Sequence, residues 1–119
     1  MREQLTRVIT RKGVIIYKLA NGKPHRDDGP AVIYPNGEKS WYQYGMLYRE
    51  DGPARTCRNG RKFWYRDNKL HREDGPAVVR PTGKIEFWLG GKFIPEDSMA
   101  GQAMLRKYTN TNTNNKDKK

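Results

Sequence analysis

Short apolar stretches alternate with polar turns along the central part of the chain, a pattern typical of β-hairpins. Residues 31–34 (Ala-Val-Ile-Tyr) are small, β-branched or aromatic, as expected for a strand. Asn36-Gly37 follows, a pair that favours a type I′ turn because both residues tolerate positive φ. Residues 39–44 (Lys-Ser-Trp-Tyr-Gln-Tyr) then predict the return strand. A hairpin of about 20 residues is too small to be stable alone, so it must pack against others.

The hairpin pattern recurs at an interval of 23 residues. Each copy contains the tetrapeptide Asp-Gly-Pro-Ala, at residues 28–31, 51–54 and 74–77. A glycine stands seven residues after each proline, and an aromatic pair follows four residues later: Gly37 with Trp41-Tyr42, Gly60 with Trp64-Tyr65, and Gly83 with Phe87-Trp88. Self-similarity at a fixed period indicates a stacked array. The sequence therefore predicts an all-β repeat fold, a single-layer array of antiparallel β-hairpins with about three full repeats and partial copies at the ends.

The Asp-Gly-Pro element is predicted to turn the chain from one hairpin into the next. Aspartate can close an Asx-turn, glycine permits positive φ, and proline fixes φ and removes a ladder donor. The expected structural turns comprise Asp28, Gly29, Pro30, Gly37, Asp51, Gly52, Pro53, Gly60, Asp74, Gly75, Pro76 and Gly83.

Aligned columns also predict the faces of the array. Two columns of mostly small residues are expected to face a shared core: Ala31, Ala54 and Ala77, and, two positions later, Ile33, Thr56 and Val79. The two members of each aromatic pair must point to opposite faces, because neighbouring residues of a strand do so. We therefore expect one aromatic column to be buried and the other to line an exposed face.

Both ends of the chain depart from the repeat. Residues 13–22 carry Tyr17 near the aromatic position, and residues 91–94 begin a unit that never reaches Asp-Gly-Pro. Terminal units of a stacked array diverge because one side faces solvent. The predicted organisation is a repeat domain over residues 1–94, with repeats at about 22–44, 45–67 and 68–90.

The C-terminal residues predict a cap and a tail. Pro95 and the acids after it are typical of a helix start, and Met99, Ala103 and Met104 recur near helical spacing. We expect a short amphipathic helix over residues 95–108 that covers the edge of the last hairpin. Residues 109–119 are rich in Thr, Asn and Lys and contain no apolar residue, which predicts a disordered polar tail.

Length and composition exclude several classes of protein. The chain has 119 residues, room for one domain, and no apolar stretch near the ~18 residues of a membrane-spanning helix. The residues after Met1 lack the apolar region of a secretory signal. A single cysteine, Cys57, excludes an internal disulfide and a cysteine-based metal cage. We expect a reducing setting, cytoplasmic (the interior of a host cell) or virion-associated.

The chain is strongly basic, with 24 Lys and Arg against 13 acids and a formal charge of +11. The excess is spread out: +4 over residues 1–21, +5 over residues 22–94 and +2 over residues 95–119. This balance favours anionic partners such as nucleic acid, acidic proteins or lipid headgroups. However, acids recur in every turn and would repel a phosphate backbone, so no continuous nucleic-acid track along all repeats is expected.

Candidate catalytic and metal-binding residues have simpler structural roles. His25 and His71 share a column with Tyr48, an exchange that a metal ligand or catalytic base would not tolerate, which favours ring packing or a loop hydrogen bond. Each acid pair follows an arginine, which predicts a local Arg–acid pair in place of a calcium loop. Cys57 has no activating neighbour in the sequence. We therefore predict no catalytic residue, no metal site and no cofactor, and the protein is not expected to be an enzyme.

Several of these features resemble the MORN-type repeat family over about residues 13–94. They are the 23-residue period, the glycine before the strand, the aromatic pair and the stretch Asn68-Lys69-Leu70-His71. The chain has His-Arg-Glu-Asp-Gly-Pro-Ala where the family usually has His-Gly-x-Gly, a variant similar to repeats of bacteriophage and large DNA-virus proteins. The resemblance implies an elongated array of hairpins that binds proteins, and sometimes anionic lipids, and it supplies no catalytic residue.

The sequence thus predicts a non-enzymatic protein-interaction module, a phage or viral accessory protein that binds a host or virion protein. Aromatic and arginine side chains are enriched at such interfaces. The alternative is a nucleic-acid-binding protein that uses the basic, aromatic-rich middle hairpin. Open sheet edges would also permit self-association. The candidate partner-binding residues are Trp41, Arg55, Arg58, Arg61, Lys62, Trp64, Arg66 and Lys69.

Overall fold

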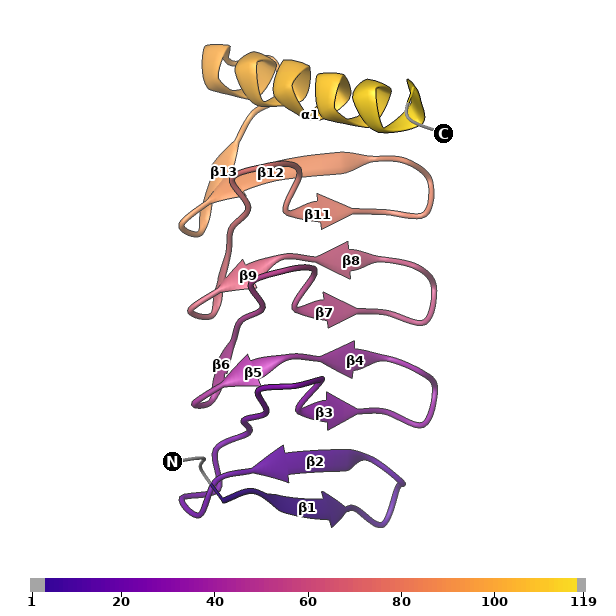
Figure 1. The fold of residues 1–119 in the computed structure, drawn as a ribbon, viewed down its shortest axis with the longest axis vertical. Coiled ribbons are helices and arrows are strands. Elements are labelled where there is room, and N and C mark those ends of the chain that lie inside the picture. Colours follow the sequence, from indigo (N-terminus) through magenta and orange to yellow (C-terminus); the bar gives the residue numbers. More distant parts are fainter. Residues whose placement is uncertain (1–3, 118–119) are drawn as a thin grey trace.

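The chain forms an array of antiparallel β-hairpins followed by one C-terminal helix, so the predicted all-β class with a single helix is confirmed (Figure 1). The computed structural model describes residues 4–117, with side chains for residues 4–110. Its elements are β1 (Thr6–Ile9), β2 (Ile15–Lys18), β3 (Val32–Ile33), β4 (Lys39–Ser40), β5 (Tyr42–Gln43), β6 (Met46–Leu47), β7 (Arg55–Thr56), β8 (Lys62–Phe63), β9 (Tyr65–Arg66), β10 (Lys69–Leu70), β11 (Val78–Val79), β12 (Ile85–Leu89), β13 (Lys92–Ile94) and α1 (Met99–Asp117).

Nine of these strands form one antiparallel sheet in the order β1-β2-β3-β4-β7-β8-β11-β12-β13. Strands at the 23-residue interval occupy equivalent places, since β3, β7 and β11 begin at Val32, Arg55 and Val78. Each step of the period therefore adds two strands to the sheet, and the molecule is elongated, 45 × 26 × 25 Å (Figure 1).

The turns between β3 and β4 and between β7 and β8 are not the predicted type I′ turns. Gly37 and Gly60 have positive φ, but Asn36 and Asn59 do not. The Gly37 amide donates to the Tyr34 carbonyl at 3.0 Å, as in a type I turn that ends in a left-handed glycine. Pro35 stands at the second position of that turn, where its fixed φ suits type I and forbids type I′.

Type I′ geometry occurs instead at the opposite edge of the array. Both residues have positive φ at Tyr44-Gly45, Asp67-Asn68 and Gly90-Gly91, the turns that join β5 to β6, β9 to β10 and β12 to β13. The return strand predicted over residues 39–44 is broken at Trp41, so that β4 joins the large sheet while β5 pairs with β6. At the break the Trp41 amide donates to the Ala54 carbonyl of the next loop, at 2.7 Å. Each unit hence contains two hairpins and not one.

One arginine closes each Asp-Gly-Pro loop. In the loop after β10, Arg72 Nε lies 2.9 Å from Asp74 Oδ1, and Arg72 Nη1 donates to the Pro76 carbonyl at 3.1 Å. Arg26 and Arg49 make the same two contacts in their own loops, at 3.1 to 3.3 Å. The predicted local Arg–acid pairs are therefore confirmed.

The glycine of each loop leaves room for this arginine, and it does not have the positive φ predicted from the sequence. Positive φ is recorded at eight glycines among the described residues, and Gly29, Gly52 and Gly75 are not among them. A Cβ on these three glycines would lie 3.1, 2.9 and 2.7 Å from the Cζ of the loop arginine. Any side chain here would have to displace the guanidinium, which lies directly against the glycine backbone.

The alanine column is the buried centre of the array, as predicted. Ala31, Ala54 and Ala77 are each 0% exposed. The second predicted core column is wrong, because Ile33, Thr56 and Val79 are only half-buried, whereas Val32 and Val78 are buried. Each alanine lies one residue before its strand, so the alternation of side chains along the strand does not extend to it.

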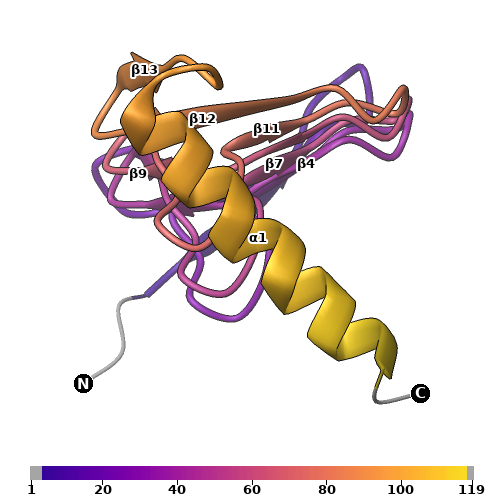
Figure 2. The ribbon, with the colours of Figure 1, turned by 90° about the horizontal axis from the view of Figure 1, so that it is seen from above.

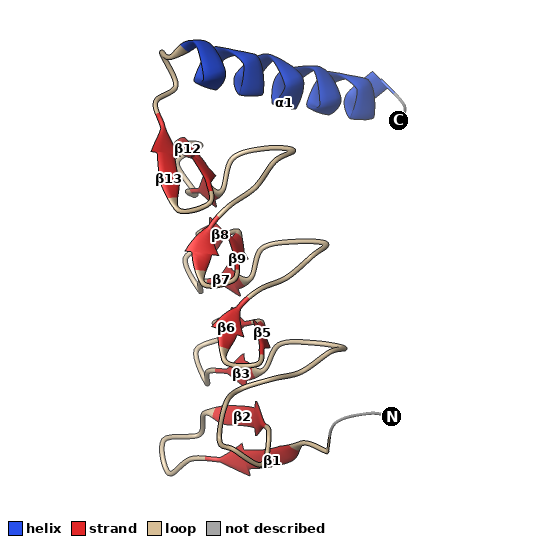
Figure 3. Ribbon diagram, turned by 90° about the vertical axis from the view of Figure 1, so that its left-hand side faces the viewer, coloured by secondary structure: helices blue, strands red, loops and turns tan. Residues whose placement is uncertain are grey.

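Neither aromatic column is buried as a whole. Phe87 is buried, while the other members, Trp41, Tyr42, Trp64, Tyr65 and Trp88, are half-buried. Beside the nine-stranded sheet, β5 pairs with β6 and β9 with β10 in two separate two-stranded sheets (Figure 3).

The C-terminal helix lies across the end of the array and crosses the last hairpin at an angle (Figure 2). Ser98 caps it, since the Gly101 amide donates to Ser98 Oγ at 3.0 Å. Gly101 is buried, and a Cβ there would collide with the Pro95 carbonyl. The helix begins four residues later than the predicted range of 95–108 and continues to Asp117.

The disordered tail predicted over residues 109–119 is therefore wrong for residues 109–117, and residues 118–119 lie outside the described part. No glycine or proline follows Gly101 to stop the helix, and each added residue closes one further backbone hydrogen bond once the helix has begun.

The cost of substituting the loop glycine should depend on whether the arginine is present. We expect Gly75→Ala to lower the free energy of unfolding by about 1–3 kcal/mol, because the new methyl group overlaps the Arg72 guanidinium. In an Arg72→Ala background the same substitution should cost less than about 0.5 kcal/mol. Urea denaturation of the four proteins of this cycle measures the coupling, and additive losses would contradict the account.

Candidate interaction grooves

Two grooves lie between successive Asp-Gly-Pro loops, on one side of the array. The first, of about 730 Å³, is lined by Arg26, Asp27, Asp28, Gly29, Pro30, Trp41, Gln43, Tyr48, Arg49, Glu50 and Asp51. The second, of about 580 Å³, contains the residue 23 positions after every one of these, together with Tyr48 and Tyr65. We call them the first and second loop groove. The period of the sequence has thus produced two equivalent sites, which differ at Asp27, Gln43 and Tyr48, replaced in the second groove by Glu50, Arg66 and His71.

Each groove contains a tryptophan that is stacked against a loop arginine. The Arg49 guanidinium lies 4.0 Å from the ring centroid of Trp41, and that of Arg72 lies 4.1 Å from Trp64. Arg26 makes the same contact with Tyr17, at 4.0 Å, so the degenerate first unit keeps the interaction. Stacking, the ion pair and the carbonyl hydrogen bond together hold each guanidinium in one place.

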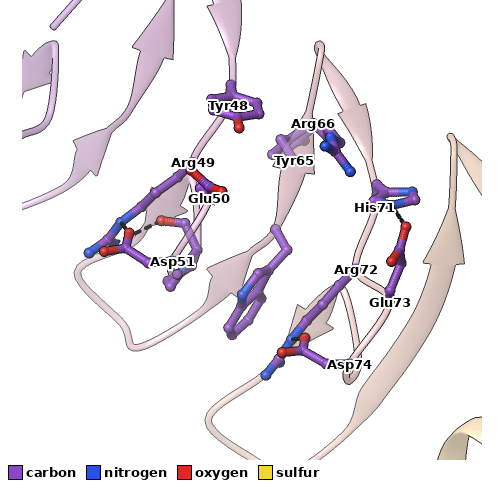
Figure 4. Close-up of a pocket in the computed structure, with 13 residues that line it drawn as sticks. Tyr48, Arg49, Glu50, Asp51, Tyr65, Arg66, His71, Arg72, Glu73 and Asp74 are labelled. Atoms are coloured by element: carbon purple, nitrogen blue, oxygen red, sulfur yellow. Dashed lines mark hydrogen bonds and ion pairs between the residues drawn. The ribbon is translucent and has the colours of Figure 1, made fainter. Parts of the chain in front are cut away.

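The rims of both grooves are acidic and open to solvent. The side chains of Asp28, Asp51 and Asp74 are 82, 87 and 81% exposed even though each contacts an arginine. Glu50 is exposed as well and lies in the wall that the two grooves share. Figure 4 shows Glu50 and Asp51 on one side of the second loop groove and Glu73 and Asp74 on the other.

The two histidines hold turns and are confirmed in the structural role predicted for them. His25 is 1% exposed, and its Nδ1 accepts a hydrogen bond from the Tyr44 amide at 3.0 Å. The Nδ1 of His71 accepts from the Gly90 amide at 2.8 Å. Each Nε2 faces a carboxylate: His25 lies 3.2 Å from Asp27, at an angle outside hydrogen-bond geometry, and His71 lies 3.3 Å from Glu73. Each ring therefore braces the type I′ turn of the following unit.

The predicted partner-binding residues are not brought together by the fold. Trp41, Trp64 and Arg66 line the loop grooves. Arg55 and Lys62 lie on β7 and β8, and Arg58 and Arg61 lie in the turn that joins these strands at the far lateral edge. Lys69 pairs with Arg66 across the β9–β10 hairpin, at the other edge. The tryptophans and the basic hairpin thus belong to different surfaces.

The sequence assigned the groove acids to turns and expected them to repel phosphate, but it did not place them around a groove that contains a tryptophan. Asp28, Asp51 and Asp74 recur with the period, but the sequence does not show that each arginine uses only part of its aspartate's surface. The sequence did contain one signal for the grooves, because the acid pair recurs with the same period as the aromatic column.

Cys57 is the single cysteine of the chain and is half-buried in the turn after β7. Burial raises the pKa of its thiol, and a hydrogen bond with Glu38 raises that pKa further. A raised pKa leaves less thiolate at neutral pH, which disfavours a role as nucleophile.

Among residues 4–117, no group of three or more His, Cys, Asp or Glu side chains is arranged to hold a metal ion. Within the same residues, the structure has no helix with the length and apolar character needed to cross a membrane.

Comparisons with known protein families, with curated proteins and with solved structures found no match to this chain. The MORN-type resemblance therefore stays a prediction from the residues that carry it.

The reactivity of Cys57 should follow its raised pKa. We expect the rate of alkylation by iodoacetamide to rise with pH about a midpoint above that of a free cysteine in an unstructured peptide. Glu38→Gln should move the midpoint downward, because the carboxylate that stabilises the neutral thiol is lost. A midpoint at or below that of the peptide control would contradict this account.

Proposed function

We propose that this protein is a non-enzymatic protein-interaction module that binds its partner through the two loop grooves. The observation that carries the proposal is their equivalence: all eleven positions of the first groove recur 23 positions later in the second, eight of them with the same residue type. A partner that contacts both grooves at once gains affinity, because its two matched contacts are held in a fixed spatial relation. On the resemblance given above, the partner would be a host or virion protein.

The contents of the grooves support binding of a protein. Tryptophan and tyrosine side chains supply large contact areas with little loss of side-chain freedom, and tryptophan, tyrosine and arginine dominate interface energetics. Because Trp41 and Trp64 are already held by Arg49 and Arg72, their rings lose little further freedom on binding. The groove volumes of about 730 and 580 Å³ suit side chains or a short peptide segment.

Glu50 is the residue best suited to a test, because it lines both grooves, is exposed and forms no hydrogen bond or ion pair among the described residues. We expect Glu50→Lys to reduce recovery of the partner in affinity purification about fivefold or more, because it reverses a charge at the shared wall. Nuclease treatment should not change the recovery.

Glu96→Lys is the matched control, since Glu96 is exposed, makes the same charge change and lies outside both grooves. Its recovery should equal that of the unaltered protein. Equal recovery with Glu50→Lys, or loss of all bound protein after nuclease, would overturn the proposal.

A second candidate function, nucleic-acid binding, is favoured by one observation. The turns that join β1 to β2, β3 to β4, β7 to β8 and β11 to β12 lie along the same lateral edge (Figure 1, right). Phosphate binding requires such a line of cations. The exposed basic residues in and beside these turns are Arg11, Lys12, Lys39, Arg58, Arg61, Lys62 and Lys84.

Binding of nucleic acid would depend on this basic edge and on salt. If the edge binds single-stranded DNA or RNA, the combined change of Arg58, Arg61 and Lys62 to Glu should abolish binding, and Glu50→Lys should not weaken it. The affinity of the unaltered protein should fall about tenfold or more between 50 and 200 mM salt, as several phosphate contacts require. Absence of any shift at low salt in a gel assay would eliminate this candidate.

A further inference from the structure

We infer that the loop grooves bind an extended cationic segment of the partner in the polyproline II conformation, with a Lys or Arg at every third residue. This inference rests on the proposed function, because it specifies the partner of the same surface. It follows from the spacing, the charge and the aromatic content of the grooves.

The spacing of the grooves matches the polyproline II helix. The two grooves are one repeat apart, and each repeat adds two strands to the sheet. Adjacent strands lie about 4.8 Å apart, so equivalent points of the two grooves lie about 9.6 Å apart. A polyproline II helix rises about 3.1 Å per residue with three residues per turn, so residues i and i+3 are about 9.3 Å apart and point the same way. In a β-strand, residues i and i+3 point to opposite faces, which excludes that conformation for two anchors.

The charge of the grooves selects a cationic anchor. The loop arginines, Arg26, Arg49 and Arg72, are each paired with an aspartate and stacked on an aromatic ring, and their side chains are only 23, 27 and 19% exposed. Each groove is lined by four acids, and only the second groove has a further, exposed arginine, Arg66. The carboxylates beside them remain largely in solvent, and Glu50 has no cationic partner among the described residues. A partner side chain that enters a groove therefore meets acids on both rims.

The basic edge of the array does not cancel this local charge. Gly37 and Gly60 mark the turns of that edge and precede Trp41 and Trp64 by four residues, or about 13 Å of extended chain. The Debye length at physiological salt is about 8 Å, so exposed charges at that distance are largely screened. The grooves thus attract cations even though the whole chain carries +11.

The aromatic side chains favour the same occupant. Both grooves contain a tryptophan beside Tyr48, and the second also contains Tyr65. Aromatic-lined grooves bind polyproline II segments well, because these segments lose little conformational freedom on binding. Lysine or arginine on such a segment can approach both the ring and the carboxylates of the rim.

The test uses nine-residue proline peptides that carry two arginines, acetylated and amidated at their ends. The arginines are placed two, three or four residues apart, so that composition and charge are identical. In a polyproline II helix, spacings of two or four rotate the second anchor by about 120° away from the first. Titration of the full chain, followed by tryptophan fluorescence, should show that spacing three binds at least about fivefold more tightly than the other two.

Variants of the chain test whether the preference for arginines three residues apart arises in the grooves. Glu50→Lys should weaken binding of the spacing-three peptide about five- to tenfold, because an attraction becomes a repulsion, and Glu96→Lys should leave it unchanged. Equal affinity for the three peptides, or no measurable binding of any of them, overturns the inference. The proposed function is judged separately by affinity purification: if Glu50→Lys abolishes recovery of the partner while the three peptides bind equally, only the inference fails.

Discussion

The structure depends on one interaction, the contact of a loop arginine with four neighbours at once. In the last loop the Arg72 guanidinium pairs with Asp74, donates to the Pro76 carbonyl, stacks on the Trp64 ring between β8 and β9 and lies against the Gly75 backbone. The Asp-Gly-Pro loop has no strand partner of its own, and its proline has no amide to donate. The arginine replaces the missing ladder bonds, and it therefore sets the shape of each connection between units.

This interaction also distributes the charge of the molecule. Arg26, Arg49 and Arg72 are held close to the sheet, while Asp28, Asp51 and Asp74 keep most of their surface in solvent. The loop side is left with exposed acids although the chain is basic overall, and one group of exposed lysines and arginines lies in and beside the turns of the lateral edge. A protein of this composition can thus offer two separate surfaces, one acidic and aromatic and the other basic. Two short strands of two residues each, β4 and β5, lie on either side of the bend at Trp41.

Much of the fold could be predicted because its signals are local. The 23-residue period, the buried alanines, the Arg–acid pairs and the bracing histidines all follow from residues close together in sequence or from aligned columns. The error over Gly75 has a clear cause. Its role depends on the Arg72 guanidinium, which lies against it. There a specific neighbour outweighs the general preference of the residue type.

The sequence by itself determined that this chain is a periodic array of hairpins. Turns and strands of a few residues are encoded by local preferences, and the fixed repeat places equivalent turns and strands at equal intervals. Only the tertiary structure decided where a binding surface could form. Asp28 and Asp51 are 23 residues apart and become opposite rims of one groove when their hairpins stack. That proximity arises from hydrogen bonding between units, which no single repeat contains.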